Sequence, residues 1–129
     1  MKISDKFHLE DINKLKNTVL TGKTEDIKWR IQHINIVSKL LDENKKEIIK
    51  SLFVDLGKSE IEGLSEILLV KEEISLIKKK LNSWMRPKKI DTPFYLFPSS
   101  SKVIYEPLGC VLILGPYNYP LLYVLKPLV

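Results

Sequence analysis

The sequence predicts an α/β protein in which several helices come first and a β-hairpin, a buried strand and a final helix follow. Apolar residues recur at helical spacing from residue 5 to residue 84. Residues 1–90 carry 19 Lys and Arg and 14 Asp and Glu, whereas residues 91–129 carry two of each. The second region instead holds six of the seven prolines and seven of the eleven aromatic residues. This division indicates two structural layers, or two domains of which one is incomplete.

The overall composition is typical of a soluble globular protein of one domain. The 129 residues are 44% hydrophobic and 29% charged, with a net charge of +5. A single cysteine excludes an internal disulfide, and the first residues lack the apolar core of a signal peptide, so we expect a cytoplasmic protein. The uncharged stretch 108–125 is long enough for a membrane helix, but two glycines, two prolines and Asn118 interrupt it, which disfavours membrane insertion.

The first two predicted helices are read from apolar spacing and end signals. One covers residues 5–21 and stops at Gly22. The next begins after a cap at Thr24 and breaks or kinks at residues 42–44. Its apolar stripe consists of Ile27, Ile31, Ile34, Val37 and Leu41.

Two more helices are predicted before the first proline. The third covers residues 45–56 and closes at Gly57. The fourth is long and covers residues 60–84. Its predicted apolar side consists of Ile61, Leu64, Leu68, Ile74, Ile77, Leu81 and Trp84.

Short extended segments are predicted after the helices. Residues 94–97 and 102–105 are expected to pair as two strands around Pro98. Residues 110–114 form an uninterrupted apolar run with turn residues on both sides, which predicts a strand buried on both faces. Cys110 lies in this run, so we interpret it as a packing residue and not as a reactive thiol.

The turn after this strand has the features of a ligand-binding corner. Gly115 permits a backbone conformation or a close approach that a Cβ would hinder. Pro120 suits the first turn of a helix, with Asn118 or Tyr119 as its cap. A strand, a sharp turn and a helix N-terminus place Asn118 at the carboxyl end of a strand, where open α/β sheets bind ligands.

The same residues carry a resemblance to a known family. Glu-Pro-Leu-Gly at 106–109, five apolar residues and then Gly-Pro-Tyr-Asn-Tyr-Pro at 115–120 resemble the segment that opens the cofactor domain of aldehyde dehydrogenases. The similarity is greatest to the class 3, fatty-aldehyde-type branch. It extends over residues 18–129, and supporting stretches are Trp29-Arg30-Ile31, Asp55-Leu56-Gly57-Lys58-Ser59-Glu60 and Glu72-Glu73-Ile74.

The resemblance implies a truncated aldehyde dehydrogenase fold: N-terminal helices, a short β-hairpin, then the first strand and helix of a Rossmann-like cofactor domain. It divides the chain into a helical region, 1–90, that packs on the cofactor domain, a hairpin and linker, 91–107, and the incomplete start of the dinucleotide-binding domain, 108–129. The catalytic domain of the family, with its cysteine nucleophile and glutamate base, would follow. The resemblance therefore implies that the 129 residues alone have no dehydrogenase activity.

The resemblance also implies a reaction and roles for particular residues. In the family a cysteine thiolate attacks the aldehyde, a hydride passes to nicotinamide, and the thioester is hydrolysed to a carboxylic acid. Asn118 matches the asparagine that stabilises the oxyanion, although from its spacing alone a helix cap is the other interpretation. Gly115, Pro116 and Tyr117 match the cofactor-side turn and are the predicted cofactor-binding residues; the alternative is a simple tight turn.

The cofactor would be NAD or NADP, and the full-length protein would be a homodimer that acts on a small-molecule aldehyde. These expectations rest on the resemblance, because the chain contains no G-x-G-x-x-G motif. No metal is expected, because His8 and His33 are far apart and no metal-ligand spacing occurs. Lys126-Pro127 mimics the family's ribose-binding Leu-Lys-Pro, but its distance from Asn118 places both residues in the last helix.

Two features leave other interpretations open. The segment between Glu60 and Glu66 is about one residue shorter than in the family and lacks an aromatic residue that often overlooks the substrate entrance. The apolar C-terminal region also fits a helical self-association module derived from a truncated dehydrogenase. A third class, a nucleic-acid binder, is disfavoured because the basic residues at 78–80, 86 and 88–89 are typical of a solvated helix end.

Overall fold

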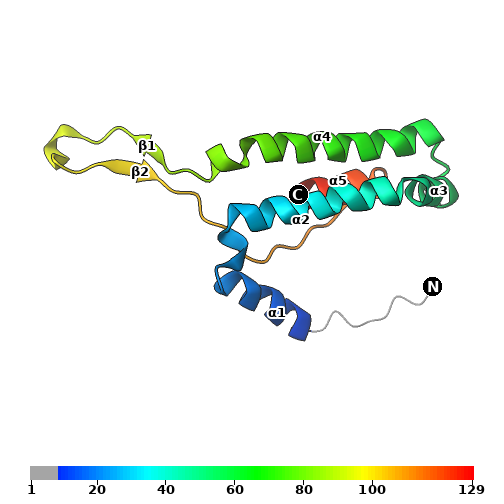
Figure 1. Ribbon diagram of the computed structural model, residues 1–129, viewed down its shortest axis with the longest axis horizontal. Coiled ribbons are helices and arrows are strands. Elements are labelled where there is room, and N and C mark those ends of the chain that lie inside the picture. The colour runs from blue at the N-terminus through cyan, green and yellow to red at the C-terminus, as the bar shows by residue number, and fades with distance from the viewer. Residues whose placement is uncertain (1–8) are drawn as a thin grey trace.

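The computed structural model describes residues 9–129. Within this range the chain is mostly helical, with one small antiparallel sheet (Figure 1). In chain order the elements are α1 (Leu9–Leu20), the 3-10 turn η1 (Lys23–Glu25), α2 (Ile27–Glu43), α3 (Lys45–Leu56), α4 (Glu60–Trp84), β1 (Lys88–Ile90), the 3-10 turn η2 (Phe94–Leu96), β2 (Ser101–Val103) and α5 (Pro120–Leu128).

Local capping chemistry determines where the helices begin and end. The Asp26 side chain accepts a hydrogen bond of 3.0 Å from the backbone nitrogen of Lys28 and so caps α2. Gly57 adopts φ 67°, a left-handed conformation that ends α3. Ser59 and Glu62 then form a reciprocal capping box that starts α4. The predicted breaks after α2, at Asn44, and after α3 are confirmed, as is the predicted extent of α4. The predicted cap at Thr24 is wrong, because Thr24 lies in η1 and Asp26 is the cap of α2. Residues 5–8 of the first predicted helix lie outside the described residues.

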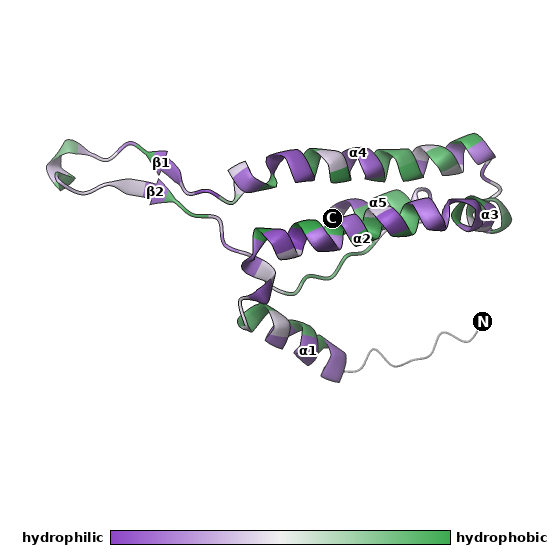
Figure 2. Ribbon diagram, in the orientation of Figure 1, coloured by the Kyte–Doolittle hydropathy of each residue, from purple (hydrophilic) through white to green (hydrophobic). Residues whose placement is uncertain are grey.

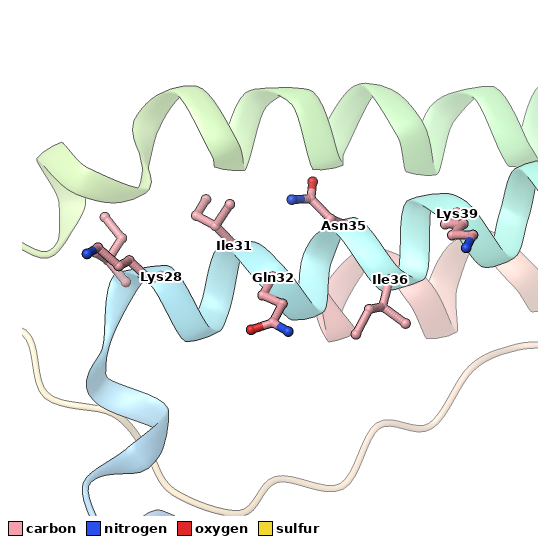
Figure 3. Close-up of a pocket in the computed structure, with 7 residues that line it drawn as sticks. Lys28, Ile31, Gln32, Asn35, Ile36 and Lys39 are labelled. Carbon is pink, nitrogen blue, oxygen red and sulfur yellow. The ribbon is translucent and has the colours of Figure 1, made fainter.

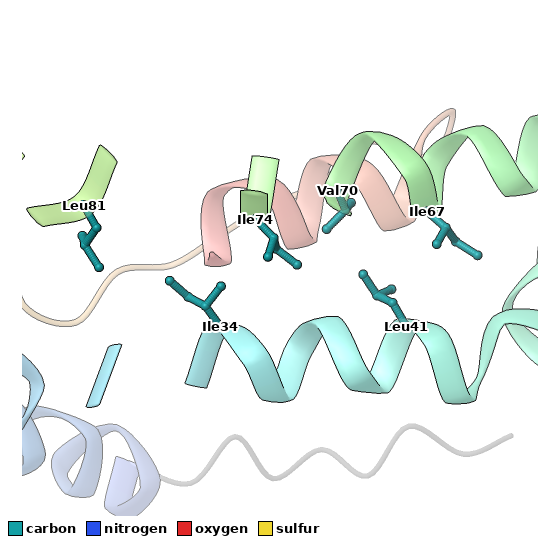
Figure 4. Close-up of a cluster of buried hydrophobic side chains, with 6 residues drawn as sticks. All are labelled: Ile34, Leu41, Ile67, Val70, Ile74 and Leu81. Carbon is teal, nitrogen blue, oxygen red and sulfur yellow. The ribbon is translucent and has the colours of Figure 1, made fainter. Parts of the chain in front are cut away.

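The core lies between α2 and α4, and α5 packs against it (Figures 1 and 4). Ile34 and Leu41 of α2 point toward α4 in Figure 4 and confirm the predicted stripe of α2. The hydropathy colouring of Figure 2 shows α5 as a largely apolar helix beside these two. The buried cluster consists of Ile34, Leu41, Ile67, Val70, Ile74 and Leu81.

The predicted apolar side of α4 is wrong in its first half. Ile61 and Leu68 are exposed, whereas Gly63, Glu66 and Ile67 are buried. The first half of α4 has apolar residues all around, so apolar spacing alone does not select one face. The approach of α3 selects it, because Gly63 leaves room for the side chain of Ile49, which would lie 3.4 Å from a Cβ at that position.

The hairpin extends away from the helices (Figure 1). Its strands pair in the register Lys88↔Val103, Lys89↔Lys102 and Ile90↔Ser101. The second predicted strand, 102–105, is confirmed in part by β2, but the first, 94–97, is wrong. Prolines at 93 and 98 flank that segment and remove backbone donors, so it forms the turn η2 and the pairing partner is β1.

The predicted buried strand at residues 110–114 is also wrong for this structure. The segment has no strand conformation, and all of it except Ile113 is exposed, including Cys110. A strand requires a neighbour to accept and donate its backbone hydrogen bonds, and no parallel partner occurs among residues 9–129. The interpretation of Cys110 as a packing residue therefore fails here.

None of the helices between residues 9 and 129 is long and apolar enough to span a membrane.

Candidate functional site

The predicted site residues occupy one turn that leads into α5. Gly115, Pro116, Tyr117 and Asn118 follow one another there, and all four are exposed. A Cβ at Gly115 would lie 2.6 Å from Cγ2 of Val124 on α5. The predicted close approach at Gly115 is therefore confirmed, and it brings the turn against the side of the helix that follows it.

The first turn of α5 lacks a cap from its own end of the chain. Tyr119 occupies the N-cap position and provides no side-chain hydrogen bond to the helix. Pro120, at the first helical position, has no backbone N–H to satisfy. Leu121 and Leu122 are the next two residues, and their backbone N–H groups both point out of the helix end. The prediction that Asn118 or Tyr119 caps this helix is therefore correct in part: Tyr119 occupies the N-cap position, but its side chain does not cap the helix.

Glu66, which lies on α4, supplies the missing acceptor. Its Oε2 accepts hydrogen bonds of 3.1 Å from the backbone nitrogens of both Leu121 and Leu122. The residue is completely buried, at 0% exposure. A carboxylate at the N-terminus of a helix also interacts favourably with the helix dipole. Glu66 thus acts as an N-cap provided by another helix.

Lys58 completes the surroundings of the buried carboxylate. Its ammonium group pairs with the other oxygen, Oε1, of Glu66, and its side chain is only 12% exposed. The Lys58 nitrogen also lies 4.1 Å from the centre of the Tyr119 ring, in a cation–π contact. A buried charge needs such compensation, because removing it from water is costly. Three donors on two oxygens leave the Glu66 carboxylate fully satisfied.

An ion pair joins α4 and α5 further along these helices. Glu73 of α4 and Lys126 of α5 approach to 3.0 Å, with side-chain exposures of 21% and 52%. Lys126 and Pro127 both lie inside α5, as predicted. Two polar contacts therefore fix α5 along α4: the buried hydrogen bonds to Glu66 at its start and a partly exposed ion pair near its end.

Asn118 lies two positions before Pro120, the first residue of α5. Its side chain is exposed, and it makes no hydrogen bond to another residue in the described part of the chain. An amide with a free NH₂ group can donate to a ligand oxygen. Tyr117, next to it, is 90% exposed, so its ring face is open to a flat ligand. The arrangement can therefore present an amide donor, an aromatic ring and main-chain atoms from one short turn.

A surface groove lies elsewhere on the molecule. It runs along α2 and is lined by Lys28, Gln32, Asn35 and Lys39 with three isoleucines between them (Figure 3). None of the predicted site residues lines it. No group of three His, Cys, Asp or Glu side chains that could hold a metal ion is found in residues 9–129.

Sequence reasoning did not single out Glu66 or Lys58. The available signal was an acidic residue between buried positions of α4, since Gly63 and Ile67 flank it on the same face. Carboxylates are rarely fully buried unless they are paired, so an acid at such a position indicates a specific partner. The incorrect assignment of the apolar face of α4 hid this signal.

Comparison with known proteins identifies the family. The model of the aldehyde dehydrogenase family matches residues 17–129. The chain belongs to the aldehyde dehydrogenase family. It is 38% identical, over 84% of its length, to the 4,4'-diaponeurosporen-aldehyde dehydrogenase of Staphylococcus aureus, of which it covers 24%. It is 36% identical, over 93% of its length, to aldehyde dehydrogenase family 3 member B3 of Mus musculus, of which it covers 25%.

The structural comparison agrees with the family assignment. A solved structure of Staphylococcus aureus AldH in a substrate-bound state superposes with a TM-score of 0.88 at 35% identity, covering 92% of this chain and 26% of the other. Family 3 member I1 of Arabidopsis thaliana is a further relative, 34% identical over 92% of this chain and 22% of its own. These relatives confirm the resemblance to class 3 and the truncated aldehyde dehydrogenase fold. The chain spans about a quarter of the length of the relatives that it matches.

Proposed function

We propose that this chain is the N-terminal part of an NAD(P)-dependent aldehyde dehydrogenase that oxidises an aldehyde to a carboxylic acid. The observation that carries the proposal is the family match over residues 17–129, which includes the turn from Gly115 to Asn118. We propose that the chain is divided into a helical region, 1–90, a hairpin and linker, 91–107, and the start of a dinucleotide-binding domain, 108–129. The nucleophilic cysteine and the general base would come from the remainder of the protein.

Asn118 is the proposed catalytic residue of this chain. A thiolate that attacks an aldehyde forms a bond to the carbonyl carbon, and the carbonyl π electrons move to the oxygen as a negative charge. The Asn118 amide donates a hydrogen bond to that oxygen and stabilises the charge as it develops. The exposed side chain, free of other described partners, supports this role over that of a helix cap.

The turn also suits the cofactor. Gly115, Pro116 and Tyr117 would hold the nicotinamide end, because the turn offers exposed main-chain atoms and a tyrosine ring that is 90% exposed. When bound, the nicotinamide ring supplies a hydride acceptor. Gly115 has no Cβ, so the turn can lie close to Val124. The choice between NAD and NADP belongs to residues outside this turn.

Replacing Asn118 tests this function. In the whole dehydrogenase, Asn118→Ala is expected to lower kcat by about 10²–10³-fold, the usual effect of losing one oxyanion donor, with little change in KM. Asn82→Ala, at an exposed position of α4, is the matched control and should leave kcat unchanged. An Asn118→Ala enzyme with native kcat would contradict the proposed role.

The 129-residue chain alone is proposed to be inactive. The proposed nucleophilic cysteine and general base belong to the rest of the protein. The single cysteine of this chain, Cys110, lies on an exposed segment, and we propose no general base for it. The assay is aldehyde-dependent NADH formation by the purified chain. A rate above that of the buffer would overturn the proposal.

Self-association is a second candidate function, favoured by exposed apolar surface. Leu108, Leu112 and Leu114 are 92%, 78% and 83% exposed, and Phe94 at the hairpin is 90% exposed. Apolar surface of this kind drives association. A homodimer in the whole enzyme and a cytoplasmic location are also proposed. Sedimentation of the 129-residue chain tests association, and a monomer that binds no apolar dye would contradict it.

A further inference from the structure

The start of α5 is held by residues that are remote in sequence from the predicted site. Leu121 and Leu122 donate to Glu66 across 55 and 56 positions of chain. These two residues follow Asn118 by three and four positions, with only Tyr119 and Pro120 between. A shift of the first helical turn would therefore be transmitted to the Asn118 amide through two residues.

The ring of Tyr119 also makes contacts that fix its position. The Lys58 ammonium group lies 4.1 Å from the ring centre and pairs with the same carboxylate that caps the helix. Tyr119 also contacts Tyr123, one turn later, edge to face with ring centres 6.1 Å apart. The residue directly after Asn118 is thus fixed by both a cation and a second ring.

We propose that Glu66 and Lys58 are positioning residues for Asn118, an inference that rests on the oxyanion role proposed above. The carboxylate fixes the first turn of α5 through its backbone, and the ammonium group fixes the Tyr119 ring. Together they hold the peptide on which the Asn118 amide is mounted. Catalytic donors must be held close to their productive geometry, and a displacement of about 1 Å can cost about 10²-fold in rate.

A glutamine at position 66 cannot reproduce the carboxylate, although it has the same shape. One oxygen of Glu66 faces the Lys58 ammonium donor and the other faces two N–H donors. A side-chain amide has one acceptor oxygen and one NH₂ donor group. Glu66→Gln must therefore place a donor against a donor on one side, whichever way the amide is turned.

The Glu73–Lys126 pair provides a matched control on the same helices. It joins α4 to α5 with a glutamate and a lysine, but it lies near the end of α5 and is partly exposed. Glu73→Gln removes an ionic contact between these helices without touching the helix start. If Glu66 served only to attach α5, both variants would act in the same way.

The first test measures the helix start in the 129-residue chain by amide hydrogen exchange. We expect Leu121 and Leu122 to be protected in the native chain, and their exchange to be at least about tenfold faster in Glu66→Gln but unchanged in Glu73→Gln, since exchange reports local opening. Equal exchange in native chain and Glu66→Gln would overturn the inference. If Glu66→Gln does not fold, Lys58→Met is the second variant. We expect Lys58→Met to broaden or shift the Asn118 side-chain NH₂ signals in the NMR spectrum. Unchanged signals would overturn the inference.

The second test is a double-mutant cycle on the kinetics of the whole dehydrogenase. Glu66→Gln is expected to lower kcat by about 10- to 100-fold with KM for the aldehyde nearly unchanged. In the Asn118→Ala background it should have almost no further effect, because its influence passes through Asn118. Glu73→Gln should retain native kcat.

The outcomes separate the inference from the function on which it rests. Two results would contradict the positioning role alone. In the first, Asn118→Ala lowers kcat but Glu66→Gln does not. In the second, both variants lower kcat and their effects multiply in the double variant. Asn118→Ala with native kcat contradicts the proposed function, and the positioning role fails with it. Non-additive loss of kcat supports both.

Discussion

Oε2 of Glu66 lies 3.1 Å from the backbone nitrogen of Leu121, a residue 55 positions later in the chain. Through this contact the second half of the chain depends on the first, because α5 has no cap of its own. The same carboxylate pairs with Lys58, which joins the α3–α4 connection to the structure. The N-terminal helices therefore do more than pack against α5, because Glu66 of α4 also provides the polar group that holds its start.

The Glu66 contact should be a major term in stability. Glu66→Ala is expected to lower the free energy of unfolding of the 129-residue chain by about 3–5 kcal/mol, because it leaves a largely buried ammonium group and two backbone donors without a partner. Glu73→Ala, which breaks the more exposed pair, should cost no more than about 1 kcal/mol. Urea unfolding measures both, and similar losses for the two variants would contradict the distinction.

Gly115 should tolerate no side chain. A Cβ there would lie 2.6 Å from Cγ2 of Val124, so Gly115→Ala is expected to cost about 1–3 kcal/mol by overpacking. Val124→Ala removes the opposing methyl groups, and the double variant Gly115→Ala/Val124→Ala should recover most of the loss. Thermal unfolding of the three variants provides the measurement. A double variant as unstable as the sum of the two would show that the strain lies elsewhere.

The capping box at α4 should make part of the stability depend on pH. Hydrogen bonds from the backbone and then the side chain of Ser59 hold the pKa of Glu62 below its ordinary value. The stabilisation is therefore complete above the pKa of a glutamate in the unfolded chain, about 4.3, and is lost as the pH falls through the lower pKa of the folded state.

A serine-to-alanine substitution tests this dependence. Ser59→Ala should destabilise the chain by about 1 kcal/mol at pH 7, and the difference from the native chain should shrink in acid. Asp26, which caps α2 through its own carboxylate, remains in both proteins. Unfolding curves at pH 7 and pH 3 measure the difference. A loss that stays constant over this range would contradict the reciprocal box.

Cys110 should react freely in the 129-residue chain. The side chain is exposed on a segment without regular structure, so a thiol reagent should modify it in the native chain about as fast as in the unfolded chain. The reaction is followed by absorbance with a chromogenic disulfide. Strong protection of the native thiol would instead show that residues 110–114 are covered, as the apolar run predicts for a buried strand.

The sequence was most informative where local chemistry decides the structure. Gly57 and the pair Ser59 and Glu62 stop one helix and start the next through their own conformations and hydrogen bonds, so the bounds of α4 were predictable. The turn at Gly115 was predictable for the same reason, since the absence of a Cβ is visible in the sequence.

The sequence was least informative where a distant segment decides. The run at residues 110–114 has the composition of a buried strand, but a strand forms only beside another strand. Glu66 reads as a surface acid until α5 brings two N–H groups to it. The family match supplied the predicted role of Asn118, and only the three-dimensional structure shows what holds the residues after it in place.

The intact mass of the native protein from its source, with the reading frame that follows Val129, tests the central claim most directly. If the chain is the N-terminal part of an aldehyde dehydrogenase, as we propose, the product should be about four times heavier than the 15.0 kDa of these residues. It should continue into a domain that bears a catalytic cysteine. A stable native product of 15.0 kDa with a stop codon after Val129 would contradict the dehydrogenase function and leave self-association as the account of the chain.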